Sequence, residues 1–346
     1  MDSARKRHAV VVGTWAFSAE PVKVAARLVS QGCTCEDSVE NALNLAEEDE
    51  KYGPFQVGRG GPPNQNGELE MDANTCISHI AEEDEKYGPF QVGRGGPPNQ
   101  NGELEMDAAI MSGKQMSFGA VTALQGISRA SSVARCVMER SKHSMLTAQG
   151  AQDFAVQSGF HLDILNTQSG DGASRIQSSE HQAKSESSSQ HDTLGIIVLD
   201  SHGNIATGVT SSGMKNKARG RIGDSALPGS GLFADNEVGA VCCSGEGDQI
   251  MKFCPSFMVL ELMRQGMEPE TACQTAIRRI TKRVKPSPPF ELAIIAVNME
   301  GKVGAATTVK EWGDTVTGRS YPGFPFAVWS GIAGEEPQIR SAQPET

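Results

Sequence analysis

The stretch that decides the fold reads TLGIIVLDSHGNIATGVTS and runs from Thr193 to Ser211. Its first part, Thr193–Asp200, is almost continuously apolar and rich in β-branched residues, a pattern typical of a strand buried on both faces. Ser201–Asn204 has the composition of a tight turn, and Ile205–Ser211 returns as a second strand. The pattern therefore predicts a hairpin of two buried strands.

The same arrangement recurs nearer the C-terminus. Leu292–Val297 is apolar, Asn298–Gly301 predicts a turn, and Lys302–Thr308 predicts the returning strand. Outside the two hairpins we expect a strand at Ala9–Gly13 and six helices with amphipathic spacing, at Pro21–Ser30, Glu36–Leu45, Ile127–Arg140, Ala148–Ser158, Ile250–Gln265 and Pro269–Val284. Antiparallel hairpins with helices packed outside them indicate an α+β layered sandwich.

Composition excludes several classes of partner. The chain of 346 residues has a formal charge of −11, which argues against nucleic acid, because binding phosphates needs a basic surface. No apolar run approaches the roughly 20 residues of a membrane helix. The apolar run Ala9–Val12 is too short for a signal peptide, which favours the cytoplasm. A truncated start would leave a lysosomal, vacuolar or secreted protein open.

The cysteines give no sign of a metal site or of a disulfide scaffold. The chain has eight of them; Cys33 and Cys35 are one residue apart, Cys242 and Cys243 are adjacent, and no CxxC pair exists. Cys242 and Cys243 lie in an apolar stretch, where a thiol usually behaves as a small buried hydrophobic group. We expect free thiols and neither a metal ion nor a cofactor.

One segment of the chain is present twice without a change. Ala46–Ala73 is repeated in all 28 residues by Ala81–Ala108, with Asn74–Ile80 between the copies. Solenoids need at least three copies with a stacking apolar face, so two identical polar copies indicate a recent duplication. Each copy has a net charge of −5, which means that nearly half of the acidity says little about the substrate. Only one copy is expected to occupy a given place in the fold.

A second break in composition precedes the hairpin. Asn166–Gln190 is rich in Ser, Gln and Gly and predicts a flexible, exposed linker. Thr193 thus starts a buried strand directly after a linker. A hydroxyl is a poor nucleophile without a base. Cleavage of the Asp192–Thr193 bond would supply one, since an α-amino group has a pKa of about 7.7–8.0. The alternative is that Thr193 is an ordinary strand residue.

Several motifs in one order favour the first interpretation. They are GTWAF (13–17), MSFGAV (116–121), VARCVMER with a following His (133–143), HDTLG (191–195), GNIATGVTSSG (203–213), KARGRIGDSALPGSGLFAD (217–235) and SGEGDQIMKFCPS (244–256). Together they resemble the glycosylasparaginase family of the N-terminal nucleophile hydrolases. The resemblance implies a four-layer αββα sandwich with two stacked, mainly antiparallel sheets. It also implies cleavage of the side-chain amide of N4-(β-N-acetylglucosaminyl)-L-asparagine, a step of glycoprotein degradation.

The same resemblance implies roles for individual residues. Thr193, released by self-cleavage after Asp192, would attack the amide carbonyl. Ser211 would orient the freed amine, and Ser244 with Gly245 would form an oxyanion hole. A Ser-Gly pair alone would be explained equally well by a turn.

Three further residues are implied in substrate binding. Arg221 would bind the α-carboxylate and Asp224 the α-ammonium group, which suits a guanidinium and a carboxylate. Without the resemblance they would be interpreted as a surface ion pair. Trp15 would line the pocket, although a tryptophan beside an N-terminal strand is often plain core.

The resemblance also implies an organisation in two halves of one domain. Residues 1–192, with the duplicated segment and the linker, would form the α half, and residues 193–346 the β half. After self-cleavage they would remain an αβ heterodimer, and two such pairs would associate. A small glycoasparagine or asparagine is the expected ligand.

Departures from the family pattern leave alternatives open. Serine stands at 211 and 244 where threonine is usual, and Pro62 and Pro97 replace a serine of the family. Ala296 stands where a disulfide partner of Cys273 would be expected. The alternatives are an L-asparaginase or isoaspartyl peptidase of the same superfamily, and an uncleaved, inactive paralogue whose duplication prevents maturation.

Overall fold

The computed structural model describes residues 8–48, 99–162, 193–214, 216–284, 290–313, 319–331 and 334–344. The predicted linker 166–190, most of both repeat copies with Pro62 and Pro97, and the residues His191 and Asp192 lie outside the described residues.

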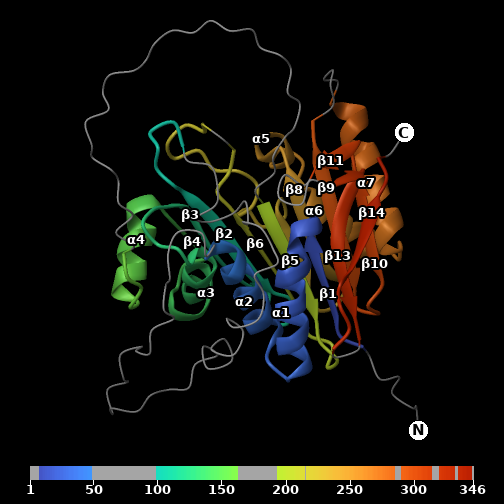
Figure 1. The fold of residues 1–346 in the computed structure, drawn as a ribbon, viewed down its shortest axis with the longest axis horizontal. Helices are drawn as coiled ribbons and strands as arrows, with labels where there is room; N and C mark the ends of the chain where they lie inside the picture. The colour runs from blue at the N-terminus through green and yellow to red at the C-terminus, as the bar shows by residue number, and fades with distance from the viewer. Residues whose placement is uncertain are drawn as a thin grey trace, which may run out of the picture.

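Two stacked sheets form the centre of the molecule (Figure 1). In the described residues the larger sheet has the order β14-β13-β1-β5-β6-β2-β3-β4, and only its β3–β4 pair is parallel. Its strands are β1 (Val10–Thr14), β2 (Met106–Ser112), β3 (Ser117–Leu124), β4 (Met145–Thr147), β5 (Thr193–Leu199), β6 (Ile205–Ser211), β13 (Phe324–Ser330) and β14 (Gln338–Ala342). The smaller sheet contains β7 (Leu232–Asp235), β8 (Gly239–Gly245), β9 (Leu292–Asn298) and β10 (Val303–Thr307), and β11 (Glu311–Gly313) pairs with β12 (Ser320–Pro322).

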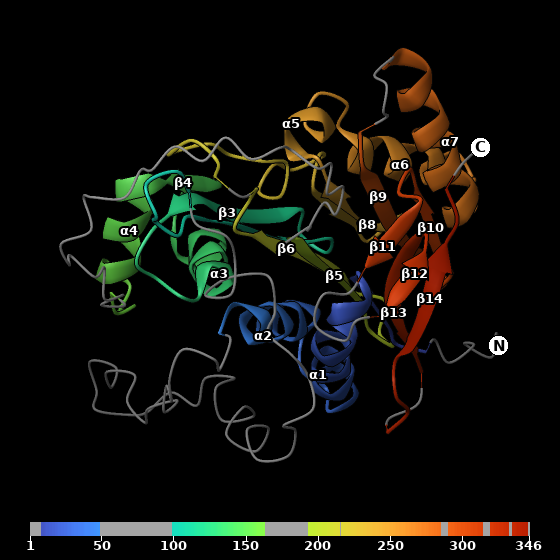
Figure 2. The same cartoon turned by 45° about the horizontal axis from the view of Figure 1, so that its top comes forward.

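Helices cover the outer face of each sheet. Figure 2 shows α1, α2 and α3 on one side of β5 and β6, and β8, β9, α6 and α7 on the other. The helices are α1 (Ala19–Ser30), α2 (Cys35–Glu47), α3 (Ala130–Arg140), α4 (Ala148–Gln157), α5 (Gly247–Ile250), α6 (Pro255–Arg264) and α7 (Pro269–Arg283), with a short 3-10 turn at Ala16–Ser18. One apolar cluster lies between the two sheets and one lies under each helical layer. The predicted four-layer sandwich is confirmed.

The two sheets approach each other closely at a glycine. A Cβ atom placed on Gly195 of β5 would lie 2.9 Å from the Cβ atom of Cys242 in β8. Both Cys242 and its neighbour Cys243 are fully buried, as their apolar surroundings predict. The seven described cysteines are all free thiols. A residue larger than glycine at 195 would push the sheets apart at the end where β5 begins.

The helix boundaries follow capping and proline chemistry. Thr34 accepts a hydrogen bond from the backbone of Asp37 and starts α2, while Pro269 begins α7. The single helix predicted at Ile250–Gln265 is wrong. Pro255 lacks the N–H that a helix interior needs, so α5 ends at Ile250, Cys254 adopts a left-handed conformation with φ 47°, and α6 starts at Pro255.

Both copies of the repeat contribute to the fold. α2 ends with Ala46 and Glu47 of the first copy, and β2 begins with Met106–Ala108 of the second. We expected one copy to occupy the connection between α2 and β2. The structure refines this expectation, because the end of α2 comes from the first copy and the start of β2 comes from the second.

Glu47 anchors the flank that comes from the first copy. Its carboxylate is fully buried and accepts hydrogen bonds from the Ser131 backbone N–H at 3.1 Å, the Ser131 hydroxyl at 2.6 Å and the Thr210 hydroxyl at 2.6 Å. These contacts join α2 to α3 and β6. Burial raises the pKa of Glu47 to about 7, although the hydroxyl and amide donors lower it.

This raised pKa predicts a pH-dependent stability. Between the ordinary carboxyl pKa and about 7 the folded protein binds more protons than the unfolded chain, so the free energy of unfolding falls as the pH rises. Glu47→Gln removes this loss, which is on the order of 3 kcal/mol. We expect the stability of the variant, measured by urea unfolding, to fall less than that of the wild type between pH 5 and pH 8. Parallel profiles would contradict the account.

Candidate functional site

A row of three polar side chains crosses the larger sheet where β5 begins. Thr193 pairs with Ser211 across β5 and β6, and Ser211 pairs with Asp107 across β6 and β2. Residues directly opposite in antiparallel strands project from the same face. The two hydroxyl oxygens, Thr193 Oγ1 and Ser211 Oγ, are 2.9 Å apart, and all three residues are buried.

The neighbouring strand fixes the start of β5. The Thr14 hydroxyl at the end of β1 donates to the carbonyl of Thr193 at 3.3 Å and accepts from the backbone N–H of Gly195 at 2.8 Å. Ser211 Oγ accepts from the N–H of Gly213 at 3.0 Å. Thr193 is therefore held through its backbone, while its hydroxyl contacts another hydroxyl.

A second hydroxyl site lies on β8 of the opposite sheet. Trp15 Nε1 donates to Ser244 Oγ at 2.9 Å, which leaves the Ser244 proton available for another acceptor. Trp15 is fully buried at φ 63°, a rare conformation for this residue, and its ring stacks on Trp312 with the centroids 5.7 Å apart. The tryptophan predicted to line a pocket therefore also holds the rotamer of Ser244.

Gly245 follows Ser244 in a backbone conformation that requires glycine. Its φ is +137°, and a Cβ atom there would lie 2.1 Å from the carbonyl oxygen of Glu291. The strand thus ends with a serine hydroxyl next to a glycine amide.

The two hydroxyl sites lie at the same end of the sandwich. Trp15 follows the last residue of β1, and β1 runs antiparallel to β5, so its bond to Ser244 places that serine at the end where β5 begins. Gly195 lies two residues after Thr193 on β5, and Cys242 lies two residues before Ser244 on β8. The close approach of Gly195 and Cys242 therefore brings the two strands together near both hydroxyls. The faces that carry Thr193 and Ser244 therefore look toward each other.

Arg221 and Asp224 lie in the loop between β6 and β7. Arg221 Nη2 is 2.6 Å from the Asp248 carboxylate, and its Nε bonds the same group at 3.1 Å. Its Nη1 lies on the side of Gly213 and Gly223, since a Cβ atom on either glycine would be 3.1 Å away. One nitrogen of the guanidinium thus faces the end of β6, two residues from Ser211.

Asp224 is a buried carboxylate with an unused acceptor. Its exposed fraction is 3%, and Asp224 Oδ2 has no hydrogen-bond partner among the described residues. Burial raises its pKa to about 7, Arg221 lowers it, and the nearby Asp107 and Asp248 raise it. Burying an unpaired acceptor costs free energy, so this site favours a bound cation.

Sequence reasoning missed the charged groups beneath this loop. Lys217, Glu105 and Asp107 are all buried, and the Lys217 ammonium donates to the carbonyl oxygen of Glu105 at 3.0 Å. Both acids belong to the duplicated segment, whose polar, acid-rich composition does not indicate a buried strand. The available signal was the alternation in LEMDAAIM, which places Asp107 inside a strand.

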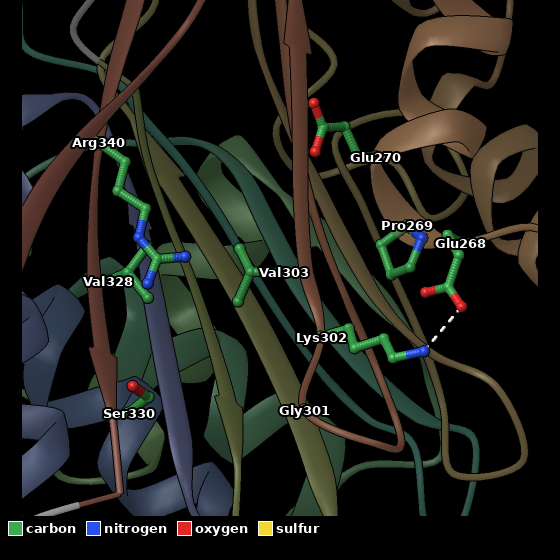
Figure 3. Close-up of a pocket in the computed structure, with 9 residues that line it drawn as sticks. All are labelled: Glu268, Pro269, Glu270, Gly301, Lys302, Val303, Val328, Ser330 and Arg340. Atoms are coloured by element: carbon green, nitrogen blue, oxygen red, sulfur yellow. Dashed lines mark hydrogen bonds and ion pairs between the residues drawn. The ribbon is translucent and has the colours of Figure 1, made fainter.

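A surface pocket lies away from these residues. It has a volume of about 410 Å³ and lies between the β9–β10 turn, the start of α7, and strands β13 and β14 (Figure 3). Lys302 pairs with Glu268 beside it at 2.7 Å. None of the residues predicted for the site lines this pocket. In the described ranges, no cluster of His, Cys, Asp and Glu could hold a metal ion, and no helix has the length and apolarity to cross a membrane.

Comparison with known proteins agrees with the motifs. The family model described as Asparaginase matches residues 74–319. An N(4)-(β-N-acetylglucosaminyl)-L-asparaginase of Elizabethkingia miricola is 33% identical over 301 residues, covering 86% of this chain and 77% of the relative. Proteins of the same name from Rattus norvegicus and Mus musculus are 36% and 35% identical, covering 86% of this chain and 83% of each relative. The chain therefore belongs to the asparaginase family.

Proposed function

We propose that this chain is an amidohydrolase that cleaves itself before Thr193 and then uses Thr193 to hydrolyse the side-chain amide of N4-(β-N-acetylglucosaminyl)-L-asparagine. The observation that carries the proposal is the pair of hydroxyls of Thr193 and Ser211, 2.9 Å apart at the start of a buried strand that faces Ser244. The names of the relatives support a substrate that has an asparagine side-chain amide linked to N-acetylglucosamine.

Self-cleavage would proceed by an acyl shift. Thr193 Oγ attacks the carbonyl carbon of Asp192, the peptide C–N bond breaks, and the Thr193 nitrogen takes a proton. Water then hydrolyses the resulting ester, leaving a carboxylate on Asp192 and a free α-amino group on Thr193. The hydroxyl of Ser211, bonded to Thr193 Oγ1, supports this step by orienting the attacking oxygen.

The released threonine carries both nucleophile and base. The α-amino group accepts the Oγ proton as Oγ attacks the side-chain amide carbon, and the negative charge develops on the amide oxygen. The Ser244 hydroxyl and the Gly245 N–H stabilise that charge, with Trp15 fixing the serine. The glycosylamine leaves with a proton, and water hydrolyses the ester to give aspartate and free Thr193.

Arg221 and Asp224 supply recognition of the amino-acid part. The ammonium group of the substrate pairs with Asp224 Oδ2, which has no partner among the described residues, and the α-carboxylate pairs with Arg221 Nη1. Asp248 holds the guanidinium plane through the other two nitrogens.

The two halves of the chain remain together after cleavage. Strand β1 from residues 1–192 lies between β5 and β13 from residues 193–346, and β2 pairs with β6 across the same division. Separating the halves would break the larger sheet, so the mature protein is an αβ heterodimer, and pairs of αβ units would associate.

The substrate preference separates the proposal from its closest alternative. L-asparagine and isoaspartyl dipeptides present the same ammonium and carboxylate groups as the glycoasparagine, and only the leaving group differs. Release of aspartate from all three substrates is therefore compared. Activity on isoaspartyl dipeptides equal to or above that on the glycoasparagine would favour an isoaspartyl peptidase.

Self-cleavage predicts two fragments. The purified protein should separate on a denaturing gel into chains of 192 and 154 residues, and N-terminal sequencing of the shorter chain should begin Thr-Leu-Gly. Thr193→Ala should remain uncut because it lacks the attacking oxygen, and Ser211→Ala should cut more slowly. A wild-type protein as intact as Thr193→Ala would refute the proposal.

The raised pKa of Asp224 predicts a pH-dependent affinity for the product. Only the ionised carboxylate binds an ammonium group, so the Kd of L-aspartate should rise as the pH falls below about 7, approaching tenfold per pH unit. Succinate is the matched control, since it lacks the ammonium group but keeps both carboxylates. If calorimetry gives the same pH dependence for both ligands, Asp224 does not bind the ammonium.

Removing one repeat copy tests the alternative that the chain is an inactive paralogue whose duplication prevents self-cleavage. Deletion of residues 49–83 joins Glu48 to Asp84 and leaves one intact copy, with the described flanks at Glu47 and β2 unchanged. Because those flanks already pack in the full chain, we expect the deletion variant and the wild type to cleave at rates within about threefold, an order-of-magnitude allowance for a shorter connection between the flanks. An uncut wild type beside a cut deletion variant would show that the duplication blocks maturation.

A further inference from the structure

Asp107 links the row of polar side chains that contains Thr193 and Ser211 to the loop that carries Arg221 and Asp224. It lies opposite Ser211 across β2 and β6, on the face that also carries Thr193. Its Oδ2 accepts a hydrogen bond from the backbone N–H of Gly223 at 3.2 Å. The side chain of Asp107 thus connects the row that contains the two hydroxyls to Gly223, the residue before Asp224.

The other carboxylate oxygen of Asp107 is held by an irregularity in the sheet. The register of β2 and β3 shifts between Met106 and Ala108, and Ala123 opposite this shift has φ 48°. The Ala123 N–H donates to Asp107 Oδ1 at 2.8 Å. The bulge therefore holds the Asp107 carboxylate in the orientation in which its other oxygen accepts from Gly223.

Buried charges support Asp107 from below the loop. Lys217 is the positive charge that lowers the pKa of Asp107 most, against the burial that raises it. Glu105, two residues earlier on the chain, accepts from the Gly220 N–H at 3.0 Å and bonds Lys217 through its carbonyl oxygen. The loop 217–224 is thus attached to the second repeat copy at Gly220 and Gly223.

We propose that Asp107 is a positioning residue that sets Asp224 and Arg221 at the distance from Thr193 required by an α-amino acid. The inference rests on the proposed function and deepens it, because it names the residue that makes the site specific for substrates with a free α-ammonium group. Asp107 does this through the backbone of the loop, while both of its oxygens stay on backbone amides.

The test is Asp107→Asn, which keeps the shape of the side chain but leaves one of the two amides facing an NH2 group instead of an acceptor. Hydrolysis of L-asparagine is compared with that of succinamic acid, which has the same amide and carboxylate but no ammonium group. We expect the KM for asparagine to rise about tenfold. This corresponds to the loss of one charge-assisted hydrogen bond, the one between the substrate ammonium group and the displaced Asp224. The kcat should change less, and the preference for asparagine over succinamic acid should fall.

Asp200→Asn is the matched control. Asp200 is also a buried carboxylate that accepts from two backbone amides, those of His202 and Asn204, but it caps the turn at the opposite end of β5 and β6. It should leave the KM and the substrate preference unchanged. If Asp107→Asn yields no folded protein, Asp107→Glu displaces Gly223 by one methylene and should shift the preference in the same direction.

The outcomes separate the two hypotheses. A wild-type protein that neither cleaves nor hydrolyses any amide refutes the proposed function. An active wild type with an Asp107→Asn variant that self-cleaves normally, and whose KM and preference are unchanged, overturns the positioning role alone. A loss of kcat that is equal for both substrates, with KM unchanged, would also overturn it.

Discussion

The pairing of β5 with β6 in its observed register is the constraint on which the candidate site depends. It places Thr193 opposite Ser211 with their hydroxyl oxygens 2.9 Å apart, and it continues the row to Asp107 on β2. A shift of one residue would turn the hydroxyls to opposite faces of the sheet. Burial on both faces prevents such a shift, because each strand is covered by a helical layer on one side and by the smaller sheet on the other.

Buried charge is the second constraint. Asp224 and Asp107 are carboxylates with raised pKa values, and Lys217 and Arg221 are the cations that offset them. Such a cluster is costly to assemble unless each group is bonded. Asp107 is bonded through both oxygens and Asp224 is not. That difference identifies Asp224 as a group suited to a ligand and Asp107 as part of the scaffold.

The sequence predicted the layers better than the connections. An apolar run with turn chemistry was sufficient for the hairpin of β5 and β6, and amphipathic spacing was sufficient for the outer helices, because both patterns report burial directly. The break at Cys254 and Pro255 was missed although proline announces it. Asp107 and Glu105 were missed for a different reason. They belong to a repeat whose overall composition is polar and acidic, and the short alternation in LEMDAAIM was the available sign that its last residues form a buried strand.

The candidate site followed from ordered motifs and not from spacing alone. The structure brings Thr193 and Ser211 together and places Ser244 on the facing strand; it also adds the bond from Trp15 that no pattern in the sequence indicates. The most direct test of the account is the mass of the 193–346 fragment during turnover of asparagine, quenched with acid and digested. The account predicts an increase equal to one aspartyl group, carried by the peptide that begins at Thr193. An active enzyme with the adduct on another residue, or with none under conditions where acylation outruns hydrolysis, would contradict it.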